Sequence, residues 1–208
     1  MFSALVMACY GSELNLVYWK PIQTGQDSDT TKLKKLTGLP EIHFRESLYH
    51  FAYPAAPHYA GRLEGIQIDT DIFSQNLLKF ANSNHIIEGV GGLNVPVNDS
   101  KLVIDVLAIL KMPVILVVSP GLGTINHSLL SLEALQNRNI PILGFYVYGR
   151  KNDLLENNIH TIQIFSGVTC LGSLDVPVSI QASEDFVLFT KENFDSEGRV
   201  KKVLTREL

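Results

Sequence analysis

The sequence has little cysteine, no long apolar run and no excess of positive charge. Its 208 residues include two cysteines, Cys9 and Cys170, which are too few and too far apart for a disulfide framework or a zinc pattern. The longest uninterrupted apolar stretch, Met112 to Val118, is far shorter than the roughly 20 residues that span a bilayer. No basic region precedes the apolar residues of the N-terminus. We therefore expect a cytoplasmic protein of a reducing compartment, with no membrane segment and no export signal.

The net charge of −4 argues against broad binding to nucleic acid, because non-specific affinity for phosphate backbones needs a basic surface. The 46% of hydrophobic residues and 18% of charged residues are typical of a soluble globular protein. The length suits one well-buried core. We therefore predict a single domain over residues 1–208, in which the charged end, residues 195–208, forms a flexible tail.

Short apolar runs alternate with helical patterns along the chain. The runs are nearly continuous rather than alternating, which predicts strands with both faces covered. Strands are expected over residues 14–19, 85–87, 113–118, 140–147 and 168–171. Helices are expected over residues 30–37, 71–81, 102–110 (capped by Asp99-Ser100), 124–138 and 183–193. This alternation predicts a three-layer α/β fold, with a mostly parallel sheet and helices on both faces.

The segment Glu88-Gly89-Val90-Gly91-Gly92 directly follows the apolar run 85–87. In open α/β sheets, ligands bind beyond the carboxyl ends of the strands. Glycines let backbone N–H groups approach a phosphate, and a glutamate can hold a hard cation beside it. The segment would equally form a tight turn with a solvent-facing glutamate, so from these residues alone both interpretations stay open.

Three further patches follow strands or their loops and are expected at the same sheet edge. They read W-K-P-I-Q-T-G from Trp19, D-S-D from Asp27, and G-L-G-T-I-N-H from Gly121. Each has an ordinary alternative: Lys20 as a surface lysine, the aspartates as helix caps, and the third patch as a helix start. The histidines lack the spacing of metal ligands, and no G-x-S-x-G elbow supports a Ser-His-Asp triad.

Taken together and in this order, the four motifs closely resemble those of dethiobiotin synthetase, with the third patch extending as G-L-G-T-I-N-H-S-L-L-S-L-E-A-L. The resemblance runs from about Ser3 to about Gly172. It implies a P-loop NTPase-like domain, usually a homodimer, that acts in biotin biosynthesis. The implied reaction is ATP-dependent closure of a cyclic urea on 7,8-diaminopelargonate with CO2.

The resemblance also implies roles for individual residues. Lys20 matches the catalytic lysine and Thr24 the hydroxyl that contacts the substrate. Asp29 and Glu88 match the carboxylates associated with Mg²⁺, the expected cofactor. The residues expected along the ATP are Asp29, Glu88, Gly89, Val90 and Gly91. The helix start that receives the substrate carboxylate from the neighbouring subunit matches Gly123, Thr124, Ile125 and Asn126.

The sequence departs from the family at its start and in two loops, one of which, Ser119-Pro120-Gly121, lacks the basic residue often found there. The family's first strand and its G-x-x-x-x-G-K-T phosphate loop are absent from these 208 residues, and Phe2 to Cys9 is expected to be the rest of the helix that this loop opens. We expect Met1 to be an internal methionine of a longer chain; the alternative is a truncated homologue that folds and dimerises without activity. Tyr148-Gly149 stands where many relatives have an asparagine that reads adenine, which leaves the nucleotide preference open.

Overall fold

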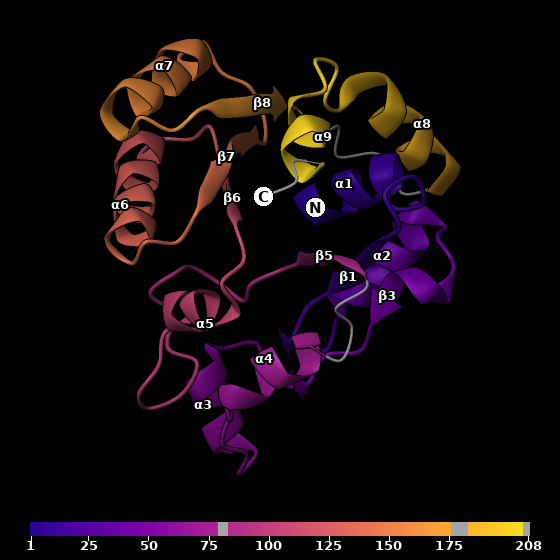
Figure 1. The fold of residues 1–208 in the computed structure, drawn as a ribbon, viewed down its shortest axis with the longest axis vertical. Helices are drawn as coiled ribbons and strands as arrows, with labels where there is room; N and C mark the ends of the chain where they lie inside the picture. Colours follow the sequence, from indigo (N-terminus) through magenta and orange to yellow (C-terminus); the bar gives the residue numbers. More distant parts are fainter. Residues whose placement is uncertain (79–82, 176–182, 206–208) are drawn as a thin grey trace. The chain divides into compact units, whose positions relative to one another are not determined.

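The computed structural model describes residues 1–78, 83–175 and 183–205, and these form two compact units. The first unit comprises Met1, Ser3–Leu110 and Gln181–Lys191, and the second comprises Phe2, Lys111–Ile180 and Glu192–Leu208. Figure 1 shows the elements of both. The single domain over residues 1–208 stays a prediction, and each unit is described by itself.

The main sheet of the first unit is parallel and has β1 at its centre. Its strand order is β3-β1-β5, with bounds Phe44–Arg45, Leu16–Trp19 and Asn84–Ile87. All four residues of β1 are buried, as predicted for a strand covered on both faces. Helix α1 (Phe2–Tyr10) confirms the helix expected at Phe2 to Cys9, and its residues 4–7 are fully buried.

A second parallel pair joins β2 (Ile22–Thr24), which follows β1, with β4 (Tyr49–Phe51), which follows β3, and this pair was not predicted. Helix α2 (Asp29–Thr37) starts five residues after β2 and confirms the predicted helix. It ends at Gly38, whose φ of 63° is the left-handed conformation that favours glycine. The loop between β2 and α2 carries one of the four motifs.

The remaining helices of the first unit are η1, α3, α4, α5 and most of α8, with bounds Glu41–His43, Pro57–Leu63, Asp71–Leu78, Val103–Leu110 and Ser183–Asn193. The last part of the helix expected over 71–81 lies outside the described residues. The predicted cap at Asp99-Ser100 is wrong. Asn98 Oδ1 accepts the Ser100 and Lys101 N–H groups in a turn, and the Asp105 carboxylate accepts the Leu102 N–H at 2.8 Å.

The second unit contains the parallel sheet β6-β7-β8, with bounds Val114–Val118, Ile142–Tyr148 and Cys170–Leu174. Helices α6 (Thr124–Asn137) and α7 (Leu155–Ser166) pack on it through a core centred on Leu132, Phe145 and Ile162. Helix α6 was predicted almost to the residue, whereas α7 was not predicted. The parallel strands and the helices between them confirm the α/β class.

The segment predicted as a flexible tail contains a helix, α9 (Arg199–Leu204). The Asp195 carboxylate accepts the N–H groups of Val200 and Lys201, which caps the helix, and Val200 is fully buried. Flexibility of residues 195–208 stays a prediction. Across the described residues, no helix is long and apolar enough to cross a membrane.

Gly144 lies in β7 where neighbouring atoms leave no room for a side chain, so its replacement tests the packing of the second unit. A Cβ at this position would lie 2.6 Å from the Leu171 Cγ and 2.8 Å from the Thr169 carbonyl oxygen, and the backbone φ is 156°. We expect Gly144→Ala to lower the free energy of unfolding by about 1–3 kcal/mol, because the sheet must shift to admit the methyl group. Gly121→Ala is the control, since nothing lies within 4 Å of its added Cβ. Equal denaturation midpoints for the two variants would contradict this packing.

Candidate functional site

Lys20 and Glu88 lie just beyond the ends of two neighbouring parallel strands of the first unit. In the register of β1 and β5, Trp19 pairs with Ile87, and the Glu88 N–H donates to the Trp19 carbonyl oxygen at 2.9 Å. Residues 68 positions apart in sequence are thus adjacent in space. The parallel pairing is what brings the lysine motif to the glutamate-glycine loop.

The Lys20 ammonium is buried between two carboxylates. Its Nζ is 3.2 Å from Glu88 Oε1 and makes a short ion pair with Asp29 Oδ2. The residue is 8% exposed, so the surface-lysine alternative is wrong. Burial lowers the pKa of Lys20, but the Asp29 and Glu88 carboxylates outweigh it, so the net pKa is raised. Lys20 is therefore a fixed positive charge at neutral pH.

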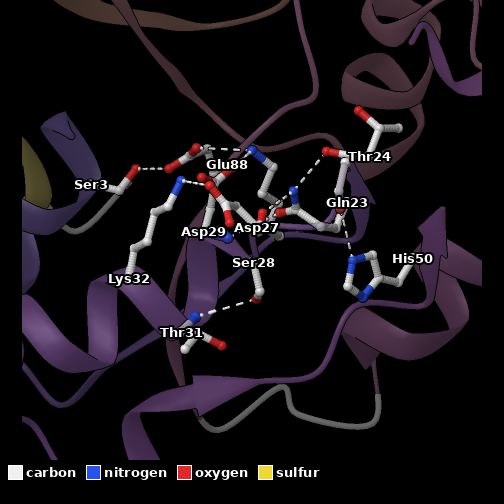
Figure 2. A network of polar contacts seen from close by, with 12 residues as sticks. Ser3, Gln23, Thr24, Asp27, Ser28, Asp29, Thr31, Lys32, His50 and Glu88 are labelled. Atoms are coloured by element: carbon white, nitrogen blue, oxygen red, sulfur yellow. Dashed lines mark hydrogen bonds and ion pairs between the residues drawn. The ribbon is translucent and has the colours of Figure 1, made fainter. Parts of the chain in front are cut away.

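Asp29 is the first residue of α2, and its side chain does not cap that helix. The cap is Ser28, whose hydroxyl accepts the Thr31 N–H at 3.3 Å (Figure 2). Asp27 is at the surface, with its side chain 82% exposed, and pairs with Lys32 at 3.2 Å. The helix-cap alternative is therefore wrong for both aspartates, and only Asp29 joins the buried lysine.

Two hydroxyl residues that the sequence did not indicate lie beside Glu88. The Ser3 hydroxyl, from α1, donates to Glu88 Oε2 at 2.5 Å, which leaves Oε1 for Lys20. The Tyr18 hydroxyl is fully buried and has no hydrogen-bond partner among the described residues. Burial raises its pKa, and the nearby Glu88 and Asp29 carboxylates raise it further. The Glu88 carboxylate is thus held from several sides, while its side chain stays 25% exposed.

The glutamate-glycine loop closes over a small apolar cavity. The cavity has a volume of about 30 Å³, and Glu88, Gly89 and Val90 form part of its wall. Gly91 has a φ of 70°, and a Cβ there would lie 3.1 Å from Val95 Cγ2, so the turn needs glycine. The loop is therefore a tight turn, but its glutamate faces Lys20 rather than solvent. Its role toward phosphate and metal stays a prediction.

Thr24 is the last residue of β2 and is partly buried. Figure 2 shows it in the same polar network as Asp29 and Glu88. The Gln23 side chain bonds its carbonyl oxygen at 2.9 Å, so the backbone of Thr24 is fixed. The first unit thus brings together Lys20, Asp29 and Glu88, and Thr24 is linked to this cluster by the Gln23 side chain.

Gly123, Thr124, Ile125 and Asn126 belong to the second unit, where they form the start of α6. Gly123 has a φ of 88°, and a Cβ there would lie 3.2 Å from the His127 ring. No side chain caps this helix end. A helix start of this kind suits an anion, because its N–H groups point outward and its dipole is positive there.

The donor set fits a magnesium ion that is shared with a nucleotide. Asp29 and Glu88 reach the same ammonium from different elements, and with Lys20 they form a cluster with one net negative charge. Mg²⁺ usually takes one or two carboxylates and completes its shell with water and phosphate oxygens. Within the described ranges, no group of three or more His, Cys, Asp and Glu side chains could hold a metal ion. The described side chains therefore do not fit a metal site whose ligands all come from the protein.

Comparison with known proteins identifies the fold and the family. The chain is similar to the cell-division protein MinD of Aquifex aeolicus, with a TM-score of 0.56 over 99% of this chain and 91% of MinD, at 10% identity. That likeness concerns the fold alone and, with the parallel sheets, confirms the predicted α/β class. Residues 1–183 match the family described as an AAA domain.

Two relatives carry the same name. The chain is 43% identical over 204 residues to the ATP-dependent dethiobiotin synthetase BioD of Leptospira interrogans, covering 98% of this chain and 92% of the relative. It is 42% identical over 169 residues to the BioD of Afipia carboxidovorans, covering 80% and 78%. With similarity of this extent and the four ordered motifs, the chain belongs to the dethiobiotin synthetase family.

Proposed function

We propose that this protein catalyses the ATP- and Mg²⁺-dependent closure of a cyclic urea on 7,8-diaminopelargonate with CO2, giving dethiobiotin, ADP and phosphate. The observation that carries the proposal is the buried Lys20 ammonium, held between Asp29 and Glu88 at the carboxyl end of β1. The names of the relatives, dethiobiotin synthetase, support the same reaction.

The reaction has three steps, none of which needs a nucleophile from the protein. One amine of the substrate adds to CO2 and loses a proton, which gives a carbamate. A carbamate oxygen then takes the γ-phosphoryl group of ATP, which releases ADP. The second amine attacks the carbonyl carbon, phosphate leaves, and loss of the amine proton completes the ring. The protein contributes position and charge.

Lys20 would stabilise the negative charge of the carbamate and of the phosphoryl group that passes to it. A buried charge fixed by two carboxylates needs little reorganisation during the reaction, which is the condition for effective electrostatic stabilisation. Its raised pKa keeps it protonated at the pH where a carbamate forms. The Thr24 hydroxyl, at the end of β2, the next strand in sequence, would bind the substrate.

Asp29 and Glu88 would hold Mg²⁺ beside the phosphates of ATP, and Gly89, Val90 and Gly91 would follow the nucleotide. When bound, Mg²⁺ neutralises the phosphate oxygens during phosphoryl transfer. The negative charge that remains on the cluster after pairing with Lys20 favours a cation there. The glycines support this role because backbone N–H groups without neighbouring Cβ atoms can approach a phosphate.

We also propose a cytoplasmic homodimer in which α6 completes the site of the neighbouring subunit. The start of α6, Gly123 to Asn126, would bind the substrate carboxylate of that subunit. Exposed apolar side chains on the second unit, Leu130 at 56% and Phe165 at 75%, support an interface there.

The proposal is tested by supplying the native protein with diaminopelargonate, bicarbonate, ATP and Mg²⁺ and measuring dethiobiotin by mass spectrometry. We expect product only when all four are present. A substrate analogue that lacks one of the two amines should give no cyclic product, because ring closure needs the second amine. ATP hydrolysis that proceeds equally without diaminopelargonate, with no dethiobiotin formed, would contradict the proposal.

A further inference from the structure

Gln23 is a buried polar residue that the proposed chemistry does not use. It is 4% exposed and lies in the middle of β2, one residue before Thr24. A buried amide must find partners for its oxygen and its two N–H groups, or it costs stability. The hydrogen-bond partners of Gln23 therefore show which segment of the backbone its side chain fixes.

The Gln23 side chain bonds both ends of the loop between β2 and α2 (Figure 2). Its Nε2 donates to the Thr24 carbonyl at 2.9 Å and to the Asp27 carbonyl at 3.0 Å. Its Oε1 accepts the Asp29 N–H at 3.2 Å. Rotating the amide by half a turn would oppose its oxygen to two carbonyls, so the three partners fix its orientation.

A glycine near the start of the loop restricts the backbone less than any other residue would. Gly25, the residue after Thr24, has a φ of 92°, and glycine allows many alternative conformations. The Gly25 N–H donates to the Phe51 carbonyl at 2.9 Å, which anchors the loop to β4. That bond holds the start of the loop, whereas the Gln23 amide holds the start and the end together.

We propose that Gln23 is a positioning residue that sets the separation between Thr24, whose hydroxyl would bind the substrate, and Asp29, whose carboxylate lies beside Lys20. This inference rests on the proposed function for its catalytic consequence. A single side chain bonds the backbone of both Thr24 and Asp29. Loss of Gln23 should therefore weaken the binding of substrate and of metal together.

Hydrogen exchange tests the clamp without any assay of activity. In Gln23→Met, a substitution of similar length with no polar atoms, the Asp29 amide loses its acceptor and should exchange at least about tenfold faster. The Gly38 amide, which bonds Lys34 at the other end of α2, should keep its rate if the fold is intact. Gln26→Met, an exposed glutamine of the same loop, is the matched control and should leave both rates unchanged. An unchanged Asp29 rate in Gln23→Met would overturn the clamp.

Kinetics and metal binding test whether loss of Gln23 weakens the binding of substrate and metal. For Gln23→Met we expect about a tenfold rise in KM for diaminopelargonate and about a tenfold weaker binding of Mn²⁺, measured by electron paramagnetic resonance of the free ion. A residue that serves stability alone would lower the melting temperature and leave both quantities unchanged, and that result would overturn the proposal.

Gln23→Glu removes both donor bonds at the same side-chain length. A carboxylate cannot donate to the Thr24 and Asp27 carbonyls, and it places an oxygen opposite them. We expect KM for diaminopelargonate to rise at least as much as in Gln23→Met. A wild-type KM in Gln23→Glu would contradict a role for the donor bonds. Absence of dethiobiotin with the wild-type protein would instead overturn the proposed function, so the two failures are distinguishable.

Discussion

Replacing Lys20 with alanine is expected to lower the rate of dethiobiotin formation by about 10²- to 10³-fold, the usual cost of removing one preorganised electrostatic group. The loss should fall on kcat, because the charge is needed most when the phosphoryl group moves to the carbamate. The change in kcat would be measured from the dethiobiotin formed in stopped assays at saturating ATP and diaminopelargonate.

Lys32→Ala is the matched control for this change. Lys32 also pairs with an aspartate, Asp27 at 3.2 Å, but both side chains are more than half exposed. Exposed ion pairs contribute little, so this variant should keep nearly full activity and stability. Lys20→Ala will also lose stability, because Asp29 and Glu88 are left without their shared counter-ion. Circular dichroism at the assay temperature must therefore show that it is folded, and a folded Lys20→Ala with wild-type kcat would contradict the assigned role.

Replacing Asp29 with asparagine is expected to raise the Mg²⁺ concentration for half-maximal rate by at least about 10- to 100-fold, since even changes to residues that only orient metal ligands cost that much. Asparagine keeps the size of the side chain but removes the negative charge that attracts the cation. The measurement is a titration of initial rate with Mg²⁺ at fixed ATP.

Asp27→Asn provides the comparison, because Asp27 is two residues away, of the same type and 82% exposed. Its Mg²⁺ dependence should match the wild type. If Asp29→Asn and Asp27→Asn shift the Mg²⁺ titration equally, the effect is one of general surface charge, and Asp29 does not hold the metal.

The sequence predicted the strands that follow continuous apolar runs, which are β1, β5, β6, β7 and β8. It also predicted α6, whose apolar residues stand at helical spacing over 14 residues. Strands β2, β3 and β4 have three, two and three residues, too few for a pattern. Helix α7 was missed because its polar residues obscure the buried pair Leu155 and Ile162.

Contacts between residues at the ends of parallel strands could be predicted from the sequence. Contacts that depend on how a helix packs could not. Lys20 and Glu88 stand at strand ends, so the topology of a parallel sheet is enough to bring them together. The contact of Ser3 with Glu88 spans 85 residues and depends on how α1 packs, which no local pattern encodes. Gln23 stood within a motif, but only the folded loop shows its three partners.

A reaction with ¹³C-labelled bicarbonate, in which dethiobiotin and ADP are quantified together, tests most directly whether the protein closes the urea ring at the expense of ATP. We expect one labelled carbon in the urea ring of each dethiobiotin and one ADP for each ring formed, with both products reduced in parallel by Lys20→Ala. ADP formed without labelled dethiobiotin, or label incorporated to the same extent by Lys20→Ala, would contradict it.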